Sequence, residues 1–372
     1  MAVSFHPTPK RILVRGVNWL GDAVMTTPAL IRLREKFRDA HIALLTPDKL
    51  RELYQDHPAV DETIGFETEE GLLSVSRKLR AGKFDLALVL PNSPRSALEV
   101  WRAGIPQRVG YARPWRNWFL TRAVSPRPGH VQMCKRTPEE VRQLVQNAGA
   151  SSEIRKPVLK IAHQLHEYLH LVGALGASME LTPPCLVITA EAEETARKFG
   201  LIDVLKDARP ILGLNPGAEY GPAKRWPADK FVAAVNEIQK RTNGVWVILG
   251  GRGDVDLAGR IASELNGATN LAGKTSLREL MALLKLCRVL LTNDTGPMHV
   301  AAALGTPVVV PFGSTSPELT GPGLPGDPRH RLLKSDAPCS PCFLRECPID
   351  FRCMNGISVE QVVGAMLEVF HL

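Results

Sequence analysis

The sequence predicts an α/β protein with two domains, each built around an open, parallel sheet. Short runs of β-branched and other apolar residues alternate with longer amphipathic runs, which is the pattern of βαβ units. The alternation begins again after residue 182, so it occurs twice. In addition, a chain of 372 residues is too long for one ordinary core and suits two domains of about 150–200 residues each.

In the first half, residues 12–14 are the first expected strand, and a loop from Gly16 to Gly21 follows it. The loop lacks a G-x-G-x-x-G pattern, so a nicotinamide-dinucleotide site is not favoured. A helical pattern covers about residues 23–37, and residues 41–45 form the next strand. Residues 86–90 form a later strand that ends at Pro91, Asn92 and Ser93.

The second half repeats this scheme. Its expected strands are residues 210–214, 245–249, 289–291 and 307–310. Pro227 lies near the first turn of an expected helix, where proline is well tolerated. Ligands of such sheets bind outside the carboxyl ends of the strands, and each polar cluster described below follows a strand. We therefore expect domains at residues 1–182 and 183–355, with a cleft between them, and a C-terminal helix at 356–372 that packs back on the N-terminal domain.

The composition is that of a globular protein, with 44% apolar and 23% charged residues. The chain contains no run of about 20 apolar residues and no apolar segment typical of a secretory signal at its start, so we expect a cytoplasmic protein. The formal net charge of +8 favours an anionic partner.

The positive charge is concentrated in residues 100–138, which contain no Asp or Glu. The basic residues of this stretch are Arg102, Arg108, Arg113, Arg116, Arg122, Arg127, Lys135 and Arg136, with Trp101, Trp115 and Trp118 between them. Prolines at positions 106, 114, 126 and 128 argue against one long helix, so we expect mostly loops and short elements. Such a stretch is either a solvated face or a surface for phosphates, carboxylates or membrane headgroups. No nucleic-acid motif accompanies it, so nucleic acid is not an expected partner.

The segment from residue 291 to residue 305 carries the clearest local signal. A buried strand ends at Asn293 and Asp294, and Thr295 and Gly296 precede a short expected helix that Gly305 closes. A helix N-terminus of this kind offers free N–H groups and a positive dipole end, which suit a diphosphate. The alternative is that Asp294 or Thr295 only caps the helix.

Two further loops follow strands. The loop after residue 214 contains Asn215 and Gly217 and ends with Lys224, whose compact charge suits a phosphate unless it is merely a surface lysine. The loop after residue 14 contains Asp22, a carboxylate suited to a general base unless it is only an N-cap.

Four cysteines lie close together in the sequence near the C-terminus, at Cys339, Cys342, Cys347 and Cys353. Four thiolates can hold a structural Zn²⁺. The second pair lies further apart than in the common zinc patterns, so free thiols are the alternative.

Taken together, these segments resemble the ADP-heptose–lipopolysaccharide heptosyltransferases of glycosyltransferase family 9. The matching segments occur in the expected order along nearly the whole chain. They are residues 19–22, 90–93, 96–98, 104–106, 215–217, 224–227 and 293–296, with His299 and the terminal cysteines. The form of residues 19–22 and 91–93 and the cysteine tail look most like heptosyltransferase II.

The resemblance implies a GT-B fold, with an acceptor-binding N-terminal domain and a C-terminal domain that binds ADP-heptose. It also implies an inverting, metal-independent transfer of L-glycero-D-manno-heptose to the inner core of lipopolysaccharide, with Asp22 as the general base. By this resemblance we expect that no cofactor is required and that the acceptor is Kdo-lipid A bearing heptose. The donor site comprises Lys224, Asp294, Thr295, Gly296, His299, Asn215, Gly217 and, as the ribose-binding acid, Asp254.

The expected acceptor site comprises Asn92, Ser93, Arg95, Arg113 and Arg116. A peripheral position at the inner face of the inner membrane follows as a hypothesis, since the lipopolysaccharide core is acidic. The alternatives are a family member that acts on another core position or on a protein, and a non-catalytic nucleotide-sugar-binding protein.

Overall fold

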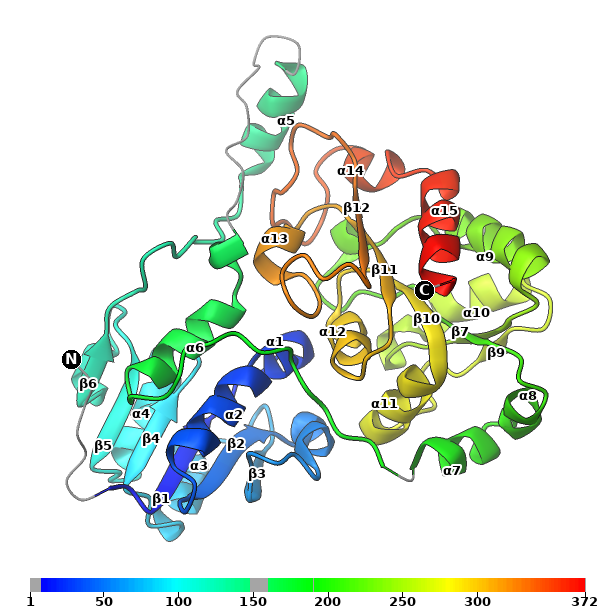
Figure 1. Cartoon of the computed structure of the whole chain (residues 1–372). Helices are drawn as coiled ribbons and strands as arrows, with labels where there is room; N and C mark the ends of the chain where they lie inside the picture. Colours follow the sequence, from blue (N-terminus) through cyan, green and yellow to red (C-terminus); the bar gives the residue numbers. More distant parts are fainter. Residues whose placement is uncertain (1–7, 148–159, 190, 372) are drawn as a thin grey trace. The chain divides into compact units, whose positions relative to one another are not determined.

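The computed structural model describes residues 8–147, 160–189 and 191–371 (Figure 1). The chain forms two compact units. The first contains Met1–His130 and Gln164–Val187, and the second contains Val131–His163 and Ile188–Leu372.

The first unit contains a six-stranded sheet in the order β3-β2-β1-β4-β5-β6, drawn from blue to teal in Figure 1. Its strands are β1 (Arg11–Arg15), β2 (His41–Pro47), β3 (Glu62–Phe66), β4 (Leu86–Val89), β5 (Gln107–Tyr111) and β6 (Arg122–Val124). All neighbouring strands are parallel. Ile12 of β1 is in register with both Ile42 and Leu86 and is completely buried, as expected for a central strand covered on both faces.

Apart from α6 (Leu165–Gly173), which follows the last strand β6, the helices of this unit connect successive parallel strands. The connecting helices are α1 (Leu20–Met25), α2 (Thr27–Lys36), α3 (Leu72–Ala81) and α4 (Pro94–Arg102), with the 3₁₀ helices η1 (Asp48–Tyr54) and η2 (Asn117–Phe119). Helix α6 packs on α2, and α3 packs on α4.

The single helix expected at residues 23–37 is divided into α1 and α2 in the structure. The division falls at Thr26 and Thr27, whose hydroxyls donate to the carbonyls of Ala23 and Val24. Pro28 lies in the first turn of α2 and has no N–H to continue the earlier helix. The two threonines and the proline therefore end one helix and begin the next.

The second unit contains the other sheet, in the order β12-β11-β10-β7-β8-β9, again with all neighbours parallel. Its strands are β7 (Ile211–Asn215), β8 (Val245–Ile248), β9 (Thr269–Asn270), β10 (Cys287–Thr292), β11 (Val308–Phe312) and β12 (Arg331–Lys334).

The helices of the second unit fall into long and short groups. The longer ones are α5 (Pro138–Gln146), α7 (Glu191–Lys198), α9 (Ala228–Thr242), α10 (Val255–Ser263), α11 (Leu277–Leu286), α12 (Gly296–Ala303) and α15 (Val359–Phe370). The short ones are α8 (Ile202–Lys206), α13 (Pro317–Thr320), α14 (Arg352–Asn355) and the 3₁₀ helices η3 (Lys160–Ala162), η4 (Pro222–Lys224) and η5 (Arg252–Asp254). As predicted, Gly305 follows α12 with a φ of +87°, a conformation that glycine adopts without strain.

Two segments belong to a different unit from the one expected from the sequence. The C-terminal helix α15 packs on α9 and on the strands β10, β11 and β12, so it belongs to the second unit and not to the first as expected. Val363, Met366 and Val369 of α15 are buried in the core of that unit, which explains its position. Residues 131–147 and 160–163 also cluster with the second unit, where the N–H of Arg136 donates to the carbonyl of Cys342 at 3.0 Å.

Within the described residues, no helix combines the length and the apolar character needed to cross a membrane.

Candidate active site

Both sheets have the same topology. Numbered within its own unit, each sheet has the strand order 3-2-1-4-5-6, which is the order of the dinucleotide-binding Rossmann fold. The order reverses between β1 and β4 in the first unit and between β7 and β10 in the second. Loops leave these two strands in opposite directions, and ligands bind in the crevice that this creates. The predicted loops that carry Asp22, Asn92, Lys224 and Asp294 follow these four strands.

The loops that follow β7 and β10, where the strand order reverses, are called the switch-point loops of the second unit. The side chain of Asn293 links these two loops. This side chain is completely buried. Its Nδ2 donates to the carbonyl of Pro216 at 2.7 Å, and its Oδ1 accepts from the N–H of Trp226 at 2.9 Å. The predicted donor residue Asn215 lies beside it and donates to the hydroxyl of Thr292 at 3.2 Å. Asn215 is therefore placed to support the loops, and Asn293 is a supporting residue that was not among the predicted donor residues.

The predicted donor residues Lys224 and Asp294 form an ion pair. The Nζ of Lys224 lies 2.7 Å from Oδ2 of Asp294, and the two side chains are only 14% and 5% exposed. The same carboxylate oxygen accepts a hydrogen bond from the Thr315 hydroxyl at 2.5 Å. A carboxylate that is buried and paired in this way holds the lysine in place, and it would repel a phosphate if it faced one. The ammonium group has three N–H donors, so the ion pair leaves it able to bind a phosphate oxygen as well.

The N-terminus of α12 begins directly after this pair. Thr295 is the N-cap residue in extended conformation, and its side chain makes no capping hydrogen bond. The carboxylate of Asp294 is engaged by Lys224 and Thr315. The alternative in which either side chain caps the helix is therefore wrong. Helix α12 starts at Gly296 with the positive end of its dipole next to the ammonium group of Lys224.

His299 lies one turn inside α12 and is buried. Burial lowers the pKa of His299 to about 4, although Asp294 acts in the opposite direction. The imidazole is therefore neutral near pH 7 and adds no positive charge beside Lys224.

The loop after β8 brings Asp254 to the same edge of the sheet. Oδ2 of Asp254 accepts from the N–H of Gly251 at 3.1 Å, and Oδ1 lies 3.6 Å from a terminal nitrogen of Arg225. A Cβ atom on Gly217 would lie 2.2 Å from the carboxyl carbon of Asp254. The lack of a side chain at Gly217 thus lets the two loops touch. The structure brings Asp254 and Gly217 together, as the donor-site prediction requires.

In the first unit, Asp22 lies in the first turn of α1, after β1, where Trp19 is the N-cap residue. The amide of Gln164, just before α6, donates to Oδ1 of Asp22 at 3.2 Å and to the hydroxyl of Tyr168 at 2.8 Å. Burial raises the pKa of Tyr168 well above its usual value, and the negative charge of Asp22 raises it further. Asp22 is thus oriented by an amide and lies near a tyrosine that stays protonated. It is not the N-cap residue that the alternative assumed.

The predicted acceptor residues follow β4 and β5 in the first unit, and Arg95 lies in the first turn of α4. Asn92, Ser93 and Arg95 are exposed, and Ser93 also caps α4 by accepting from the N–H of Ser96 at 3.3 Å. Arg113 is partly exposed, and its N–H donates to the side chain of Asn117 at 2.9 Å.

Arg116 has a different position from the other acceptor candidates. Its side chain is completely buried, and its guanidinium donates to the carbonyl of Pro91 at 2.7 Å and to the side chain of Asn92 at 3.3 Å. Burial lowers the pKa of Arg116 to about 10, and the charge of Arg113 contributes. In this position Arg116 supports the Pro91–Asn92 turn, and the turn presents Asn92 to solvent.

The terminal cysteines do not form the zinc site that their spacing allowed. Cys339, Cys342 and Cys353 are buried, and Cys347 is partly buried. Burial raises the pKa of the Cys339, Cys342 and Cys353 thiols, and the nearby cysteines raise them further. No group of three or more metal-binding side chains comes together among the residues that the structure describes, and these include all four cysteines. Cys339, Cys342 and Cys353 instead pack in the core of the second unit.

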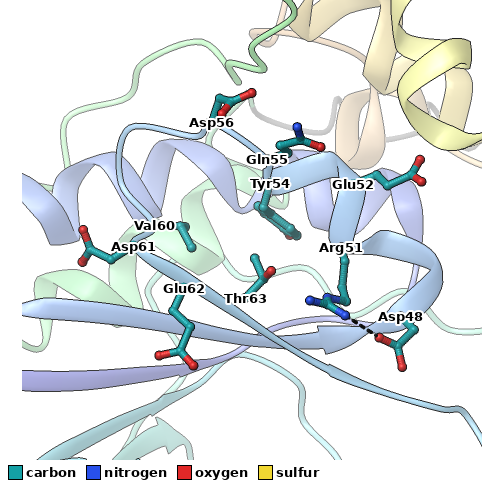
Figure 2. Close-up of a pocket in the computed structure, with 10 residues that line it drawn as sticks. All are labelled: Asp48, Arg51, Glu52, Tyr54, Gln55, Asp56, Val60, Asp61, Glu62 and Thr63. Carbon is teal, nitrogen blue, oxygen red and sulfur yellow. Dashed lines mark hydrogen bonds and ion pairs between the residues drawn. The ribbon is translucent and has the colours of Figure 1, made fainter.

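A hollow of about 570 Å³ lies beside η1 in the first unit (Figure 2). It is lined by Asp48, Arg51, Glu52, Tyr54, Gln55, Asp56, Val60, Asp61, Glu62 and Thr63. Five of these ten residues are acidic, so the hollow repels anions. It contains none of the predicted site residues, and the switch-point loops remain the candidate active site.

Two sheets of Rossmann order, one of them carrying a lysine beside a helix N-terminus, define a class of α/β proteins that bind nucleotides. Comparison with known proteins identifies the family within this class. The family model of glycosyltransferase family 9 (heptosyltransferase) matches residues 72–351. Lipopolysaccharide heptosyltransferase 2 of Escherichia coli K12 is 32% identical over 323 residues, which cover 84% of this chain and 85% of that protein. The chain therefore belongs to glycosyltransferase family 9 and is a glycosyltransferase.

Solved structures agree with this assignment. The structure of the E. coli ADP-heptose lps heptosyltransferase II covers 97% of this chain and 98% of its own, with a TM-score of 0.74 and 27% identity. A family 9 glycosyltransferase from Veillonella parvula, with 24% identity and a TM-score of 0.76, shares the fold. The predicted GT-B class, with two Rossmann-like α/β domains, is confirmed.

Proposed function

We propose that the protein transfers L-glycero-D-manno-heptose from ADP-heptose to the heptose- and Kdo-containing inner core of lipopolysaccharide. The observation that carries the proposal is the ion pair of Lys224 and Asp294 at the N-terminus of α12, on the β7–β10 switch point. The ammonium group of Lys224 and the N-terminus of α12 are two sources of positive potential for a nucleoside diphosphate. The relatives named heptosyltransferase 2 support heptose as the sugar and the lipopolysaccharide core as the acceptor.

In the proposed reaction, the carboxylate of Asp22 accepts the proton of the acceptor hydroxyl. The oxygen then attacks the anomeric carbon of the heptose, and the bond from that carbon to the diphosphate breaks with its electron pair staying on ADP. Attack opposite the leaving group inverts the anomeric configuration. The hydrogen bond from Gln164 supports this role, because it fixes the orientation of the carboxylate that takes the proton.

The leaving ADP gains negative charge as the bond breaks. Lys224 and the N–H groups at the start of α12 stabilise this charge, which is the electrostatic role that a metal ion has in many other transferases. His299, neutral near pH 7, adds a hydrogen bond, and Asp254 binds the ribose. Asn215 and Gly217 shape the loop that carries Lys224.

Heptose transfer is expected to continue at its full rate in an excess of EDTA. The reason is that protein groups supply the positive charge at the diphosphate. The measurement is the initial rate with and without chelator, after dialysis against chelator. A rate that falls at least tenfold and returns with added Mg²⁺ would contradict the metal-independent mechanism.

The decisive experiment is a transfer assay with ADP-heptose and a panel of core acceptors truncated at successive sugars, read by mass spectrometry. We expect a mass increase of one heptose only with acceptors that already carry heptose on Kdo-lipid A. Transfer to another core position or to a protein would indicate a different member of the family. Binding of ADP-heptose without transfer to any acceptor would indicate a non-catalytic protein.

We further propose that the first unit contacts the cytoplasmic face of the inner membrane, where the lipid-linked acceptor is found. Support comes from the loop of residues 113–118. Trp115 and Trp118 are 79% and 82% exposed, within a stretch that contains no acidic residue. The buried Arg116 between them fixes the loop, and Trp115 has a φ of +62°, a strained value for a bulky residue. Exposed tryptophans beside a partly exposed arginine, Arg113, suit the interface of an anionic membrane.

Replacing both Trp115 and Trp118 by alanine is expected to weaken binding to anionic vesicles by about 10-fold or more, because each indole ring loses its interfacial contact. Co-sedimentation with phosphatidylethanolamine/phosphatidylglycerol vesicles measures this. The matched control is Leu73→Ala, which removes another exposed apolar side chain, on α3. Equal binding by the double variant and the control would rule out this loop as the membrane contact.

A further inference from the structure

Three cations gather around one aromatic ring in the second unit. The Nζ atoms of Lys224 and Lys135 lie 5.1 and 5.9 Å from the ring centre of Tyr220, and the guanidinium carbon of Arg345 lies 5.3 Å from it. These residues come from three separate segments of the chain. Lys224 belongs to the predicted donor site, whereas Lys135, Arg345 and Tyr220 have no role in the function proposed above.

The cluster is fastened by main-chain contacts. The Tyr220 hydroxyl donates to the carbonyl of Phe343 at 2.9 Å, and Nε of Arg345 donates to the carbonyl of Tyr220 at 2.7 Å. The carbonyl of Arg345 in turn accepts from the N–H of Ala223 at 3.0 Å, one residue before Lys224. Gly221 permits this close approach, because a Cβ there would lie 2.4 Å from the same carbonyl oxygen. The segment that carries Arg345 is therefore held directly against the loop that carries Lys224.

The cluster contains more positive than negative charge. Asp294 pairs with Lys224, but no carboxylate of the described residues pairs with Lys135 or Arg345. Both side chains are exposed, and the two terminal nitrogens of Arg345 donate to none of the described residues. The faces of the Tyr220 ring attract cations only weakly, whereas the three positive charges repel one another. An anion bound among them is therefore stabilised by all three cations.

We infer that Arg345 and Lys135 extend the diphosphate site and bind the terminal phosphate of a nucleoside diphosphate together with Lys224. The ring of Tyr220 contacts all three cations and sets their spacing. The terminal nitrogens of Arg345 form a fork that matches two phosphate oxygens, and Lys135 adds a point charge. The inference rests on the proposed function, since it assumes that the site binds ADP.

The test compares the affinities of the full-length protein for ADP and AMP by isothermal titration calorimetry, because only ADP has the terminal phosphate. Arg345→Gln is expected to weaken ADP binding about 10-fold and Lys135→Gln about 3-fold, with AMP affinity within about 2-fold of wild type. Tyr220→Leu removes the aromatic ring that the three cations contact, and it should weaken ADP binding as Arg345→Gln does. Lys240→Gln, which removes an exposed cation from α9, is the matched control and should change neither affinity.

The outcomes separate this inference from the proposed function. If the wild-type protein binds ADP no more tightly than AMP, the diphosphate site itself is wrong. If the wild-type protein prefers ADP and the Arg345→Gln and Lys135→Gln variants keep the same preference, the cluster does not hold the terminal phosphate. An equal loss of ADP and AMP affinity would also overturn the inference, because it would mean that these residues only support the loop.

Discussion

The Asp22→Asn variant is expected to lose heptose transfer by a factor of about 10²–10⁴ while it binds ADP-heptose within about 2-fold of wild type. Asparagine has the shape of aspartate and keeps an oxygen that can accept the hydrogen bond from Gln164. It cannot take a proton from the acceptor hydroxyl. The substitution therefore removes proton transfer and leaves the local structure in place. Single-turnover rates and calorimetric donor affinity measure the two quantities separately.

The control for Asp22 is Asp39→Asn, which removes one exposed carboxylate from the same unit. It should leave both transfer and donor binding unchanged. If the Asp22→Asn variant transferred heptose within 10-fold of the wild-type rate, a different group would be the base. If it lost donor binding to the same extent as transfer, Asp22 would act in binding and not in proton transfer.

The central strands of both sheets could be predicted from the sequence because they are buried on both faces. Residues 12–14 and 289–291 are continuous apolar runs, and they became parts of β1 and β10. The edge strands were missed. β12 has the sequence RLLK and is only partly buried, and β9 has two residues, so neither produces a run that differs from a loop.

The loops of the site could also be predicted, because polar residues directly after a buried strand lie at the carboxyl edge of a parallel sheet. The partners of these residues could not. Gln164 lies 142 residues from Asp22, and Thr315 lies 21 residues from Asp294. Such pairs depend on tertiary packing, which sequence spacing does not record.

Burial explains two other differences between the sequence-based predictions and the structure. Arg116 belongs to a basic stretch that predicted an exposed surface, but its guanidinium lies inside and binds main-chain oxygen. The cysteine spacing allowed a metal site, but Cys339, Cys342 and Cys353 pack among the apolar residues of the core. Composition and spacing cannot tell a buried polar side chain from an exposed one.

The Lys224→Ala variant is expected to lose ADP affinity by about two orders of magnitude. Truncating one partner of a buried, hydrogen-bonded charge pair costs about 2–5 kcal/mol, much of it from the charge left unpaired. In this variant the carboxylate of Asp294, only 5% exposed, keeps just the Thr315 hydroxyl and places an uncompensated negative charge near the phosphates. Calorimetry with ADP measures the loss, and Lys240→Ala on α9 is the charge-matched control. An unchanged affinity would remove Lys224 from the diphosphate site.

A double variant separates the two causes of this loss. Lys224→Ala combined with Asp294→Asn lacks the ammonium and also the unpaired carboxylate, while asparagine can still accept the hydrogen bond of Thr315. If Asp294 serves to hold Lys224, the double variant should bind ADP about 10-fold more tightly than Lys224→Ala alone, although still more weakly than wild type. If Asp294 binds the donor itself, the second substitution should weaken binding further. The sign of this coupling therefore decides whether the carboxylate of the Asp294-Thr295-Gly296 loop positions the lysine or touches the substrate.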